Sequence, residues 1–205
     1  MTAPSRFGAG RRLILVRHSV SEIRRDVPSA EWRLSAEGLA RARAFARRLH
    51  PSGSTAVFTS AEPKAAETAR ALAAEWGLAV EEVPGLHEHE RPEARLLSRE
   101  AFEQRIRELF DRPNEVAFGA ETAEEARRRF TTALMPIVAR AEGDVVVVTH
   151  GTVMSLFVAD ATGAEPFAFW KRQEMPCAVT LRLPELTLEG ATFLTDRSGR
   201  LQPPS

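Results

Sequence analysis

Short apolar runs alternate along the chain with longer segments of helical periodicity. Continuous apolar runs of strand length are typical of strands covered on both faces of a parallel sheet. The run at residues 145–148 is the most apolar and the run at 79–83 is the most polar. The predicted strands are residues 13–16, 56–59, 79–83 and 145–148, followed by one or two closing strands at 178–183 and 191–194.

Helix start and stop signals flank the periodic segments. Ser35 and Ser98 stand where N-cap side chains would, and Pro63 suits the first turn of a helix that Gly77 ends. Each of these signals places a helix between or beside two predicted strands.

The later helices follow the same logic. Thr122 and Glu125 have the spacing of a capping box, so a helix begins there, and Pro136 is expected to kink or end it. Residues 151–161 form the next helix. Strands that alternate with helices of this length predict an α/β fold with a mostly parallel sheet. The 205 residues are interpreted as a single domain whose ends, 1–10 and 202–205, are mobile.

Charge and composition narrow the function. The 28 basic and 28 acidic residues cancel, which argues against a nucleic-acid or membrane binder that works through bulk positive charge. Of the basic residues only Lys64 and Lys171 are lysines. The single cysteine, Cys177, excludes an intramolecular disulfide, and no run is long enough for a signal peptide or a membrane span. The expected location is the cytoplasm.

Polar groups follow four of the predicted strands directly. In open α/β sheets, ligands bind at the carboxyl ends of the strands. Two histidines more than a hundred residues apart occupy such positions, which is hard to explain as two unrelated buried histidines. The residues that would converge are Arg17-His18-Ser19-Val20-Ser21, Thr59-Ser60 with Lys64 behind them, Leu86-His87-Glu88 and Thr149-His150-Gly151-Thr152.

This set of groups favours phosphoryl chemistry. Imidazoles, a guanidinium, an ammonium and hydroxyl or backbone donors suit a tetrahedral dianion. A neutral imidazole can act as a nucleophile, and Glu88 could protonate a departing alkoxide. No metal or other cofactor is needed, because cationic side chains can neutralise the transferring group. The predicted partner is a small phosphorylated substrate.

The motifs resemble those of the histidine phosphatase superfamily, also called phosphoglycerate mutase-like. Residues 13–21 are similar to its strand and Arg-His-Gly signature, with Ser19 in place of glycine. Residues 59–69 are similar to its Ser-Ser-Pro-Leu-x-Arg-Ala-x-Gln-Thr-Ala block, with Lys64 on the arginine. Further blocks resemble 34–38, 86–88, 121–122 and 147–152. The resemblance implies a three-layer α/β/α sandwich.

The resemblance also implies roles for individual residues. His18 would be the phosphorylated nucleophile and Glu88 the acid and then the base. The phosphoryl oxygens would be held by Arg17, Lys64, His150, Ser21, Gly151 and Thr152. The implied activity is that of a metal-independent histidine acid phosphatase-type phosphomonoester hydrolase. The alternatives are a phosphoglycerate mutase-type phosphotransferase and, because Ser19 and Lys64 depart from the pattern, a non-catalytic phosphate sensor.

Several other polar residues are interpreted as ordinary surface. His87-Glu88-His89 lacks the spacing of a zinc motif, and His89 and Glu90 are expected in a solvated loop. The run at 127–129, three arginines, is interpreted as a solvated helix face. Arg24 and Arg25 either contact the leaving group or belong to an exposed loop.

Overall fold

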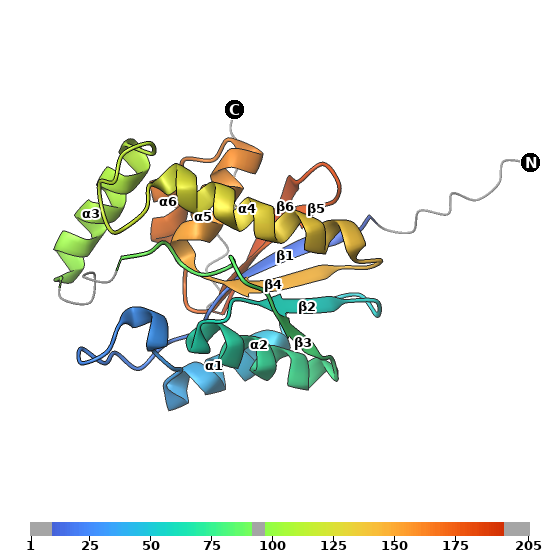
Figure 1. The fold of residues 1–205 in the computed structure, drawn as a ribbon. Helices are drawn as coiled ribbons and strands as arrows, with labels where there is room; N and C mark the ends of the chain where they lie inside the picture. The colour runs from blue at the N-terminus through green and yellow to red at the C-terminus, as the bar shows by residue number, and fades with distance from the viewer. Residues whose placement is uncertain (1–9, 92–96, 195–205) are drawn as a thin grey trace, which may run out of the picture.

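Six strands form one sheet in the order β3-β2-β4-β1-β5-β6. The computed structural model describes residues 10–91 and 97–194. The strands are β1 (Arg12–Arg17), β2 (Ala56–Thr59), β3 (Val80–Glu82), β4 (Val145–Thr149), β5 (Cys177–Arg182) and β6 (Thr187–Phe193). The first four strands in this sheet order run parallel, and β5 and β6 pair antiparallel at the edge beside β1. The mostly parallel sheet predicted from the sequence is therefore confirmed (Figure 1).

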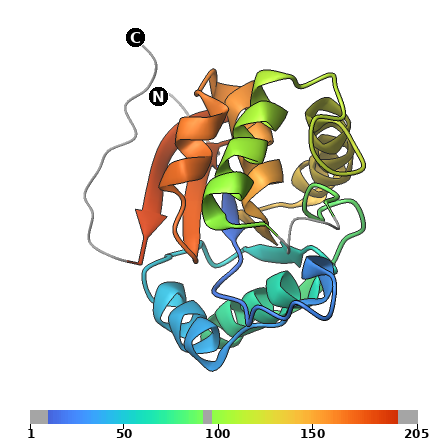
Figure 2. The ribbon, with the colours of Figure 1, turned by 90° about the vertical axis from the view of Figure 1, so that its left-hand side faces the viewer.

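Helices cover both faces of this sheet. They are the 3-10 helix η1 (Ser29–Glu31), α1 (Ala36–Ala46), α2 (Pro63–Trp76), α3 (Arg99–Asp111), α4 (Ala123–Arg140), α5 (Gly151–Thr162) and α6 (Pro166–Arg172). Figure 2 shows α1 and α2 side by side on one face, and α3 to α6 lie on the other. The expected three-layer α/β/α sandwich is confirmed.

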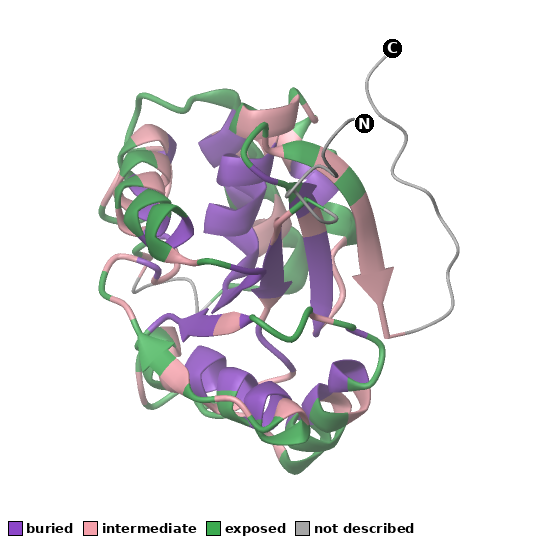
Figure 3. Cartoon of the chain, turned by 90° about the vertical axis from the view of Figure 1, so that its right-hand side faces the viewer, coloured by how far each residue is buried: buried purple, intermediate pink, exposed green. Residues whose placement is uncertain are grey.

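Alternate residues of the central strands supply the two cores. On β1, Ile14 and Val16 join the core under α1 and α2, whereas Leu13 and Leu15 join the larger core under α4 and α5. β4 divides its valines in the same way and is buried along its whole length. Figure 3 shows these central strands as the buried interior of the fold. Burial on both faces explains why these strands are continuous apolar runs.

The predicted helix boundaries are largely confirmed. Ser35, Ser98 and Thr122 cap their helices with side-chain oxygens, the last within a capping box with Glu125. Gly77 ends α2 with φ 68°, a left-handed conformation that glycine adopts without a Cβ clash. The sequence did not predict η1 or α6, which are too short to display a clear period.

Pro136 does not end its helix, so this part of the prediction is wrong. The helix α4 continues to Arg140. Because proline has no backbone N–H, the carbonyl of Thr132 loses its helical hydrogen-bond donor. Thr132 and Pro136 are both exposed, so water can donate to that carbonyl. Beyond the proline, Ile137 and Val138 are buried in the larger core and hold the last turn in place. Of the ends expected to be mobile, residues 1–9 and 202–205 lie outside the described residues.

Candidate active site

His18 lies just beyond β1, and one of its two ring nitrogens is hydrogen-bonded to the backbone. Its backbone N–H donates to the Thr149 carbonyl at 2.9 Å, and its Nδ1 lies 2.7 Å from the Ser19 carbonyl. A carbonyl only accepts, so Nδ1 carries the hydrogen and Nε2 of the neutral ring keeps its lone pair. Within residues 10–91 and 97–194, Nε2 has no hydrogen-bond partner. The ring thus presents one nitrogen with a free lone pair, and such a nitrogen can act as a nucleophile.

The surroundings keep this ring neutral. Burial, and then the charges of His150, Lys64 and Arg17, hold the pKa of His18 well below its usual value. Burial and Lys64 lower the pKa of His150 in the same way. A histidine with a lowered pKa is unprotonated at neutral pH and available for attack.

His150 faces His18 from the N-terminus of α5. The two rings meet edge to face with centroids 5.2 Å apart. His150 is fully buried, and its Nε2 lies 2.9 Å from Ser60 Oγ, just beyond β2. Three strand ends predicted to converge, those of β1, β2 and β4, therefore do so.

Arg17 and Lys64 both place a positive charge near His18, and each is held by different contacts. Arg17 Nη1 donates to the Gln173 carbonyl at 3.1 Å. Lys64, only 5% exposed, donates to the Ser29 carbonyl at 2.7 Å and forms an ion pair with Glu62. Lys64 is therefore held between a carboxylate and a backbone carbonyl.

Gly151 allows Arg17 to approach the start of α5. A Cβ at Gly151 would lie 3.1 Å from both Arg17 Nε and Gln173 Oε1, tighter than ordinary contact. The side-chain amide of Gln173 also donates to the Gly151 carbonyl at 3.1 Å and to Ser155 Oγ at 2.6 Å. Gln173 thus fixes both Arg17 and the first turn of α5, and no motif in the sequence pointed to it.

Glu88 caps α5 as an anion. Its carboxylate accepts the N–H groups of His89, Thr152 and Val153 at 2.9 to 3.2 Å and pairs with Arg91 at 2.9 Å. Burial works to raise the pKa of Glu88, but Arg91 and the backbone donors outweigh it, and the pKa lies well below its usual value. Thr152 contributes its hydroxyl, which accepts from Arg91 at 3.1 Å. The carboxylate is held ionised.

Ser19 stands where the resemblance calls for glycine, and its side chain points away from the pocket. The hydroxyl donates to the Gly38 carbonyl at 2.7 Å, and the backbone N–H donates to Thr68 Oγ1 at 3.0 Å. Ser19 thereby joins the segment that carries His18 to α1 and α2, and its carbonyl remains the acceptor for His18 Nδ1.

Buried polar atoms without partners gather at this site. In the described part of the chain there are six such side-chain atoms, and four belong to Arg17, Ser21, His150 and Gln173. Each such atom costs about 1–3 kcal/mol when it stays unsatisfied. Three of the four residues can donate through those atoms: Arg17 Nε, Ser21 Oγ and His150 Nδ1. Buried donors of this kind suit an anionic ligand.

The surface interpretation is wrong for His89 and Arg129, whereas Glu90 and Arg128 are exposed as expected. His89 is 2% exposed and contacts the Glu121 carbonyl through Nε2 at 2.8 Å, stacked on Phe118. Arg129 donates to the carbonyls of the loop that carries Glu88, and it pairs with Glu121 at 2.6 Å. Sequence periodicity assigns α4 a polar face but cannot tell which polar side chain meets a neighbouring loop. Arg24 pairs with Asp26 at 2.5 Å on an exposed loop.

Glu62 and Arg91 are charged residues of the site that the sequence analysis did not select. Glu62 is the residue before α2, and its Oε1 accepts the backbone N–H of Glu88 at 2.8 Å. Arg91 packs over the Phe102 ring, with its guanidinium carbon 5.3 Å from the ring centroid. Their positions, two residues before Lys64 and three after Glu88, were the available signals.

The three polar side chains after β3 diverge. His87 lies near Glu90, Glu88 reaches α5, and His89 points to the Glu121 backbone. Across residues 10–91 and 97–194, no group of three or more His, Cys, Asp or Glu side chains is arranged to hold a metal ion. No helix in these same ranges is long and apolar enough to span a membrane.

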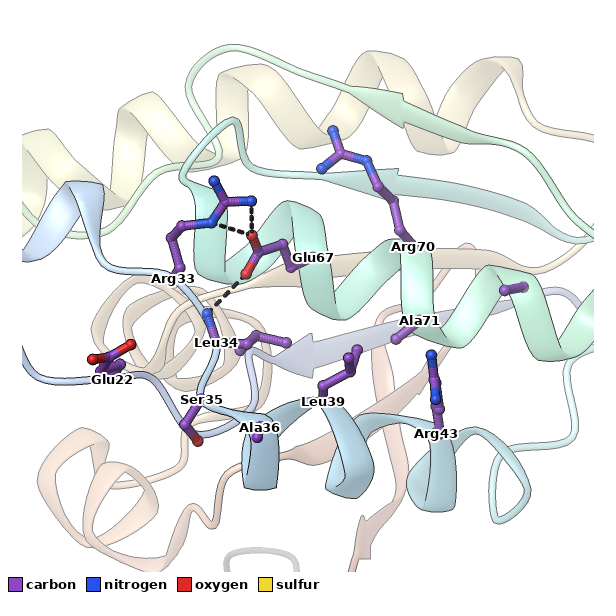
Figure 4. A pocket seen from close by; sticks show the side chains of 11 residues that line it. Glu22, Arg33, Leu34, Ser35, Ala36, Leu39, Arg43, Glu67, Arg70 and Ala71 are labelled. Atoms are coloured by element: carbon purple, nitrogen blue, oxygen red, sulfur yellow. Dashed lines mark hydrogen bonds and ion pairs between the residues drawn. The ribbon is translucent and has the colours of Figure 1, made fainter.

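A hollow of about 550 Å³ lies between the loop before α1 and the helices α1 and α2. Figure 4 shows Glu67 in it, bound to the Arg33 side chain and to the backbone N–H of Leu34. Arg43 and Arg70 line its far end. None of the candidate catalytic residues lines this hollow, so it is separate from the strand-end site.

Comparison with known proteins gives a family and a fold. The model of the histidine phosphatase superfamily (branch 1) matches residues 13–191. No curated protein matches the chain. Among solved structures, mycobacterial glucosyl-3-phosphoglycerate phosphatase in complex with inorganic phosphate is 20% identical, with TM-score 0.66 over 83% of this chain and 89% of that one.

Two further solved structures have the same fold. Bacillus stearothermophilus YhfR is 21% identical, with TM-score 0.68 over 87% of this chain and 94% of that one. Entamoeba histolytica phosphoserine phosphatase in complex with 3-phosphoglyceric acid is 16% identical, with TM-score 0.68 over 90% and 98%. At these identities the likeness concerns the fold.

Proposed function

Because the chain belongs to the histidine phosphatase superfamily, we propose that it is a metal-independent phosphatase that hydrolyses a phosphomonoester through a phosphohistidine on His18. The observation that carries this proposal is the state of the buried, neutral imidazole of His18. Its Nδ1–H is hydrogen-bonded to the Ser19 carbonyl, and its Nε2 has no partner among the described residues. The unsatisfied donors beside it support a bound phosphoryl group.

In the proposed reaction, Nε2 of His18 attacks phosphorus as the bond to the leaving oxygen breaks. Arg17, Lys64 and His150 hold the phosphoryl oxygens, with the Ser21 hydroxyl, the Gly151 backbone N–H and the Thr152 hydroxyl as further donors. A carboxyl group protonates the leaving oxygen, and the resemblance assigns that role to Glu88. Water then attacks phosphorus, releasing inorganic phosphate and restoring His18.

The solved relatives support a small phosphorylated substrate. One is a glucosyl-3-phosphoglycerate phosphatase seen with phosphate and another a phosphoserine phosphatase seen with 3-phosphoglyceric acid. We propose a small phosphomonoester for this chain too, and a cytoplasmic location. No observation favours the mutase or the sensor over the phosphatase.

The test is phosphate release from 4-nitrophenyl phosphate in the presence of chelator. We expect turnover by the wild type, loss of at least about 1,000-fold in His18→Ala, and no change in His50→Ala, which alters an exposed histidine. An acid-labile, alkali-stable phosphoenzyme should form in the wild type and not in His18→Ala. Absence of turnover with a panel of aryl and alkyl phosphates would refute the phosphatase, and phosphate binding without turnover would favour the sensor.

A further inference from the structure

Glu62 connects three segments of the strand-end site. It directly precedes α2 and stands where the family block quoted above has leucine. Its side chain is 11% exposed, and its Oε2 pairs with Lys64. Its Oε1 accepts the backbone N–H of Glu88 at 2.8 Å and lies 3.5 Å from Nε2 of His150. Glu62 therefore places a negative charge at one edge of the His150 ring.

The two edges of the His150 ring have different surroundings. At Nε2 lie the carboxylate of Glu62 and the hydroxyl of Ser60, the latter 2.9 Å away. The other ring nitrogen, Nδ1, is buried and has no hydrogen-bond partner within residues 10–91 and 97–194. The ring meets that of His18, the proposed nucleophile, with centroids 5.2 Å apart. The Nδ1 edge is therefore the one available to a phosphoryl group beside His18.

The single hydrogen of a neutral His150 ring can serve only one of these edges. A carboxylate only accepts hydrogen bonds, so Glu62 favours a hydrogen on Nε2. A neutral ring in that form presents the lone pair of Nδ1 to the phosphoryl oxygens, which are also acceptors. A cationic ring carries a hydrogen on both nitrogens, so it can donate from Nδ1 while Nε2 faces Ser60 and Glu62. The position of Glu62 thus favours a cationic His150 beside a phosphoryl group.

Substrate changes the electrostatic balance at His150. The charged and titratable groups that face this ring are His18, Glu62, Lys64, His87, Glu88 and Arg91. In the protein alone, burial and then the charge of Lys64 hold the pKa of His150 well below its usual value, against the opposite effect of Glu88. A phosphoryl dianion at the Nδ1 edge raises this pKa, because a nearby opposite charge favours the cation. His150 then lies between two anionic groups, the dianion and Glu62.

We propose that Glu62 is a positioning residue of the phosphatase reaction, which holds His150 with Nδ1 toward the phosphoryl group and acts as the counterion of the cationic ring. This inference rests on the proposed function. His150 takes up one proton from solvent when the substrate binds, donates to a phosphoryl oxygen during the reaction, and releases the proton when inorganic phosphate leaves. Glu88 keeps the role of acid and base that the resemblance assigns to it.

Proton uptake on anion binding tests this role. Tungstate is a tetrahedral dianion that keeps its charge throughout the neutral pH range. The slope of log Kd for tungstate against pH, measured by titration calorimetry, therefore counts the protons that the protein takes up. We expect about one proton for the wild type and at most about 0.3 for Glu62→Gln, which keeps the shape of the side chain but removes its charge. A merely structural role would change Kd by the same factor at every pH.

Two further measurements support this test. The ring nitrogen chemical shifts of His150 should show two N–H groups in the wild-type complex with tungstate and one in Glu62→Gln. Turnover of 4-nitrophenyl phosphate by Glu62→Gln should fall at least about tenfold, the effect of one unit in pKa, and Glu62→Asp should recover part of it. The control Glu75→Gln, which alters an α2 carboxylate paired with Arg47 at the surface, should match the wild type in all three.

The outcomes separate this role from the proposed function. If Glu62→Gln takes up as many protons as the wild type, or if the wild type binds tungstate without proton uptake, the role of Glu62 is overturned while the phosphatase stands. Glu62→Leu, with the residue of the family block, gives the same test if Glu62→Gln does not fold. If proton uptake depends on Glu62 but the wild type hydrolyses no phosphate ester, the proposed function fails and the counterion role stands. A wild type that does not bind tungstate would overturn the role of Glu62 as well.

Discussion

Gly38 should be among the least replaceable residues of the chain, because it lets α1 pass against the segment that carries His18. A Cβ at this position would lie 1.9 Å from the Val20 carbonyl oxygen, well inside contact distance. That oxygen also accepts the backbone N–H of Ser35 at 3.0 Å. In Gly38→Ala, the segment after His18 and the start of α1 must therefore separate by more than about 1 Å.

The expected loss in the free energy of unfolding of Gly38→Ala follows from these contacts. Overpacking contributes about 3 kcal/mol and the weakened hydrogen bonds to Val20 about 1 kcal/mol. The higher helix propensity of alanine returns about 1 kcal/mol. The net loss of about 3 kcal/mol corresponds to a fall of about 6–12 °C in the midpoint of thermal unfolding for a chain of this length.

Urea unfolding followed by tryptophan fluorescence measures this loss. Gly53→Ala is the matched control, since a Cβ at Gly53 would meet nothing within 4 Å. Phosphatase activity of Gly38→Ala should fall as well, because the Ser19 hydroxyl donates to the Gly38 carbonyl and the Ser19 carbonyl orients His18. A free energy of unfolding for Gly38→Ala within about 1 kcal/mol of the control would refute the reasoning.

Three further predictions concern charged groups. Arg129→Met removes the ion pair and the carbonyl contacts that hold the Glu88 loop, so it should cost about 3 kcal/mol in urea unfolding, whereas Met at the exposed Arg128 should cost little. The pKa values of His18 and His150 lie well below 6.5, so the unfolded chain binds more protons below that pH. The free energy of unfolding should then fall by up to about 2.7 kcal/mol per pH unit as pH drops from 6.5 toward the folded values, and a flat profile would contradict this. Lys64→Arg should lower kcat/KM roughly tenfold or more, because the larger guanidinium must fit between Glu62 and Ser29; a gain in kcat/KM would contradict it.

The sequence predicted the structure best where a local feature, such as a buried strand or a helix N-cap, requires a particular type of residue. The apolar runs required burial on both faces, and Ser35, Ser98 and Thr122 capped the helices they precede. Arg17, His18 and His150 could be placed together because parallel strands end at a common edge.

The rest depended on contacts between segments far apart in the chain. The contacts of Arg129 join α4 to a loop more than forty residues earlier, and Gln173 reaches the first turn of α5 from beyond α6. Neither helical periodicity nor a sequence motif predicts such a long-range contact. The same holds for the backbone partners of Glu88, because α5 supplies two of them.

The charge balance of the pocket connects these observations. The site holds three positive charges, on Arg17, Lys64 and Arg91, and two negative charges, on the carboxylates of Glu62 and Glu88. With both histidines neutral, its net charge is therefore about +1. A phosphate dianion would turn this into −1 in a buried site, where an uncompensated charge is costly. Binding of the dianion therefore favours the uptake of about one proton by the complex, which the pH dependence of phosphate binding would measure.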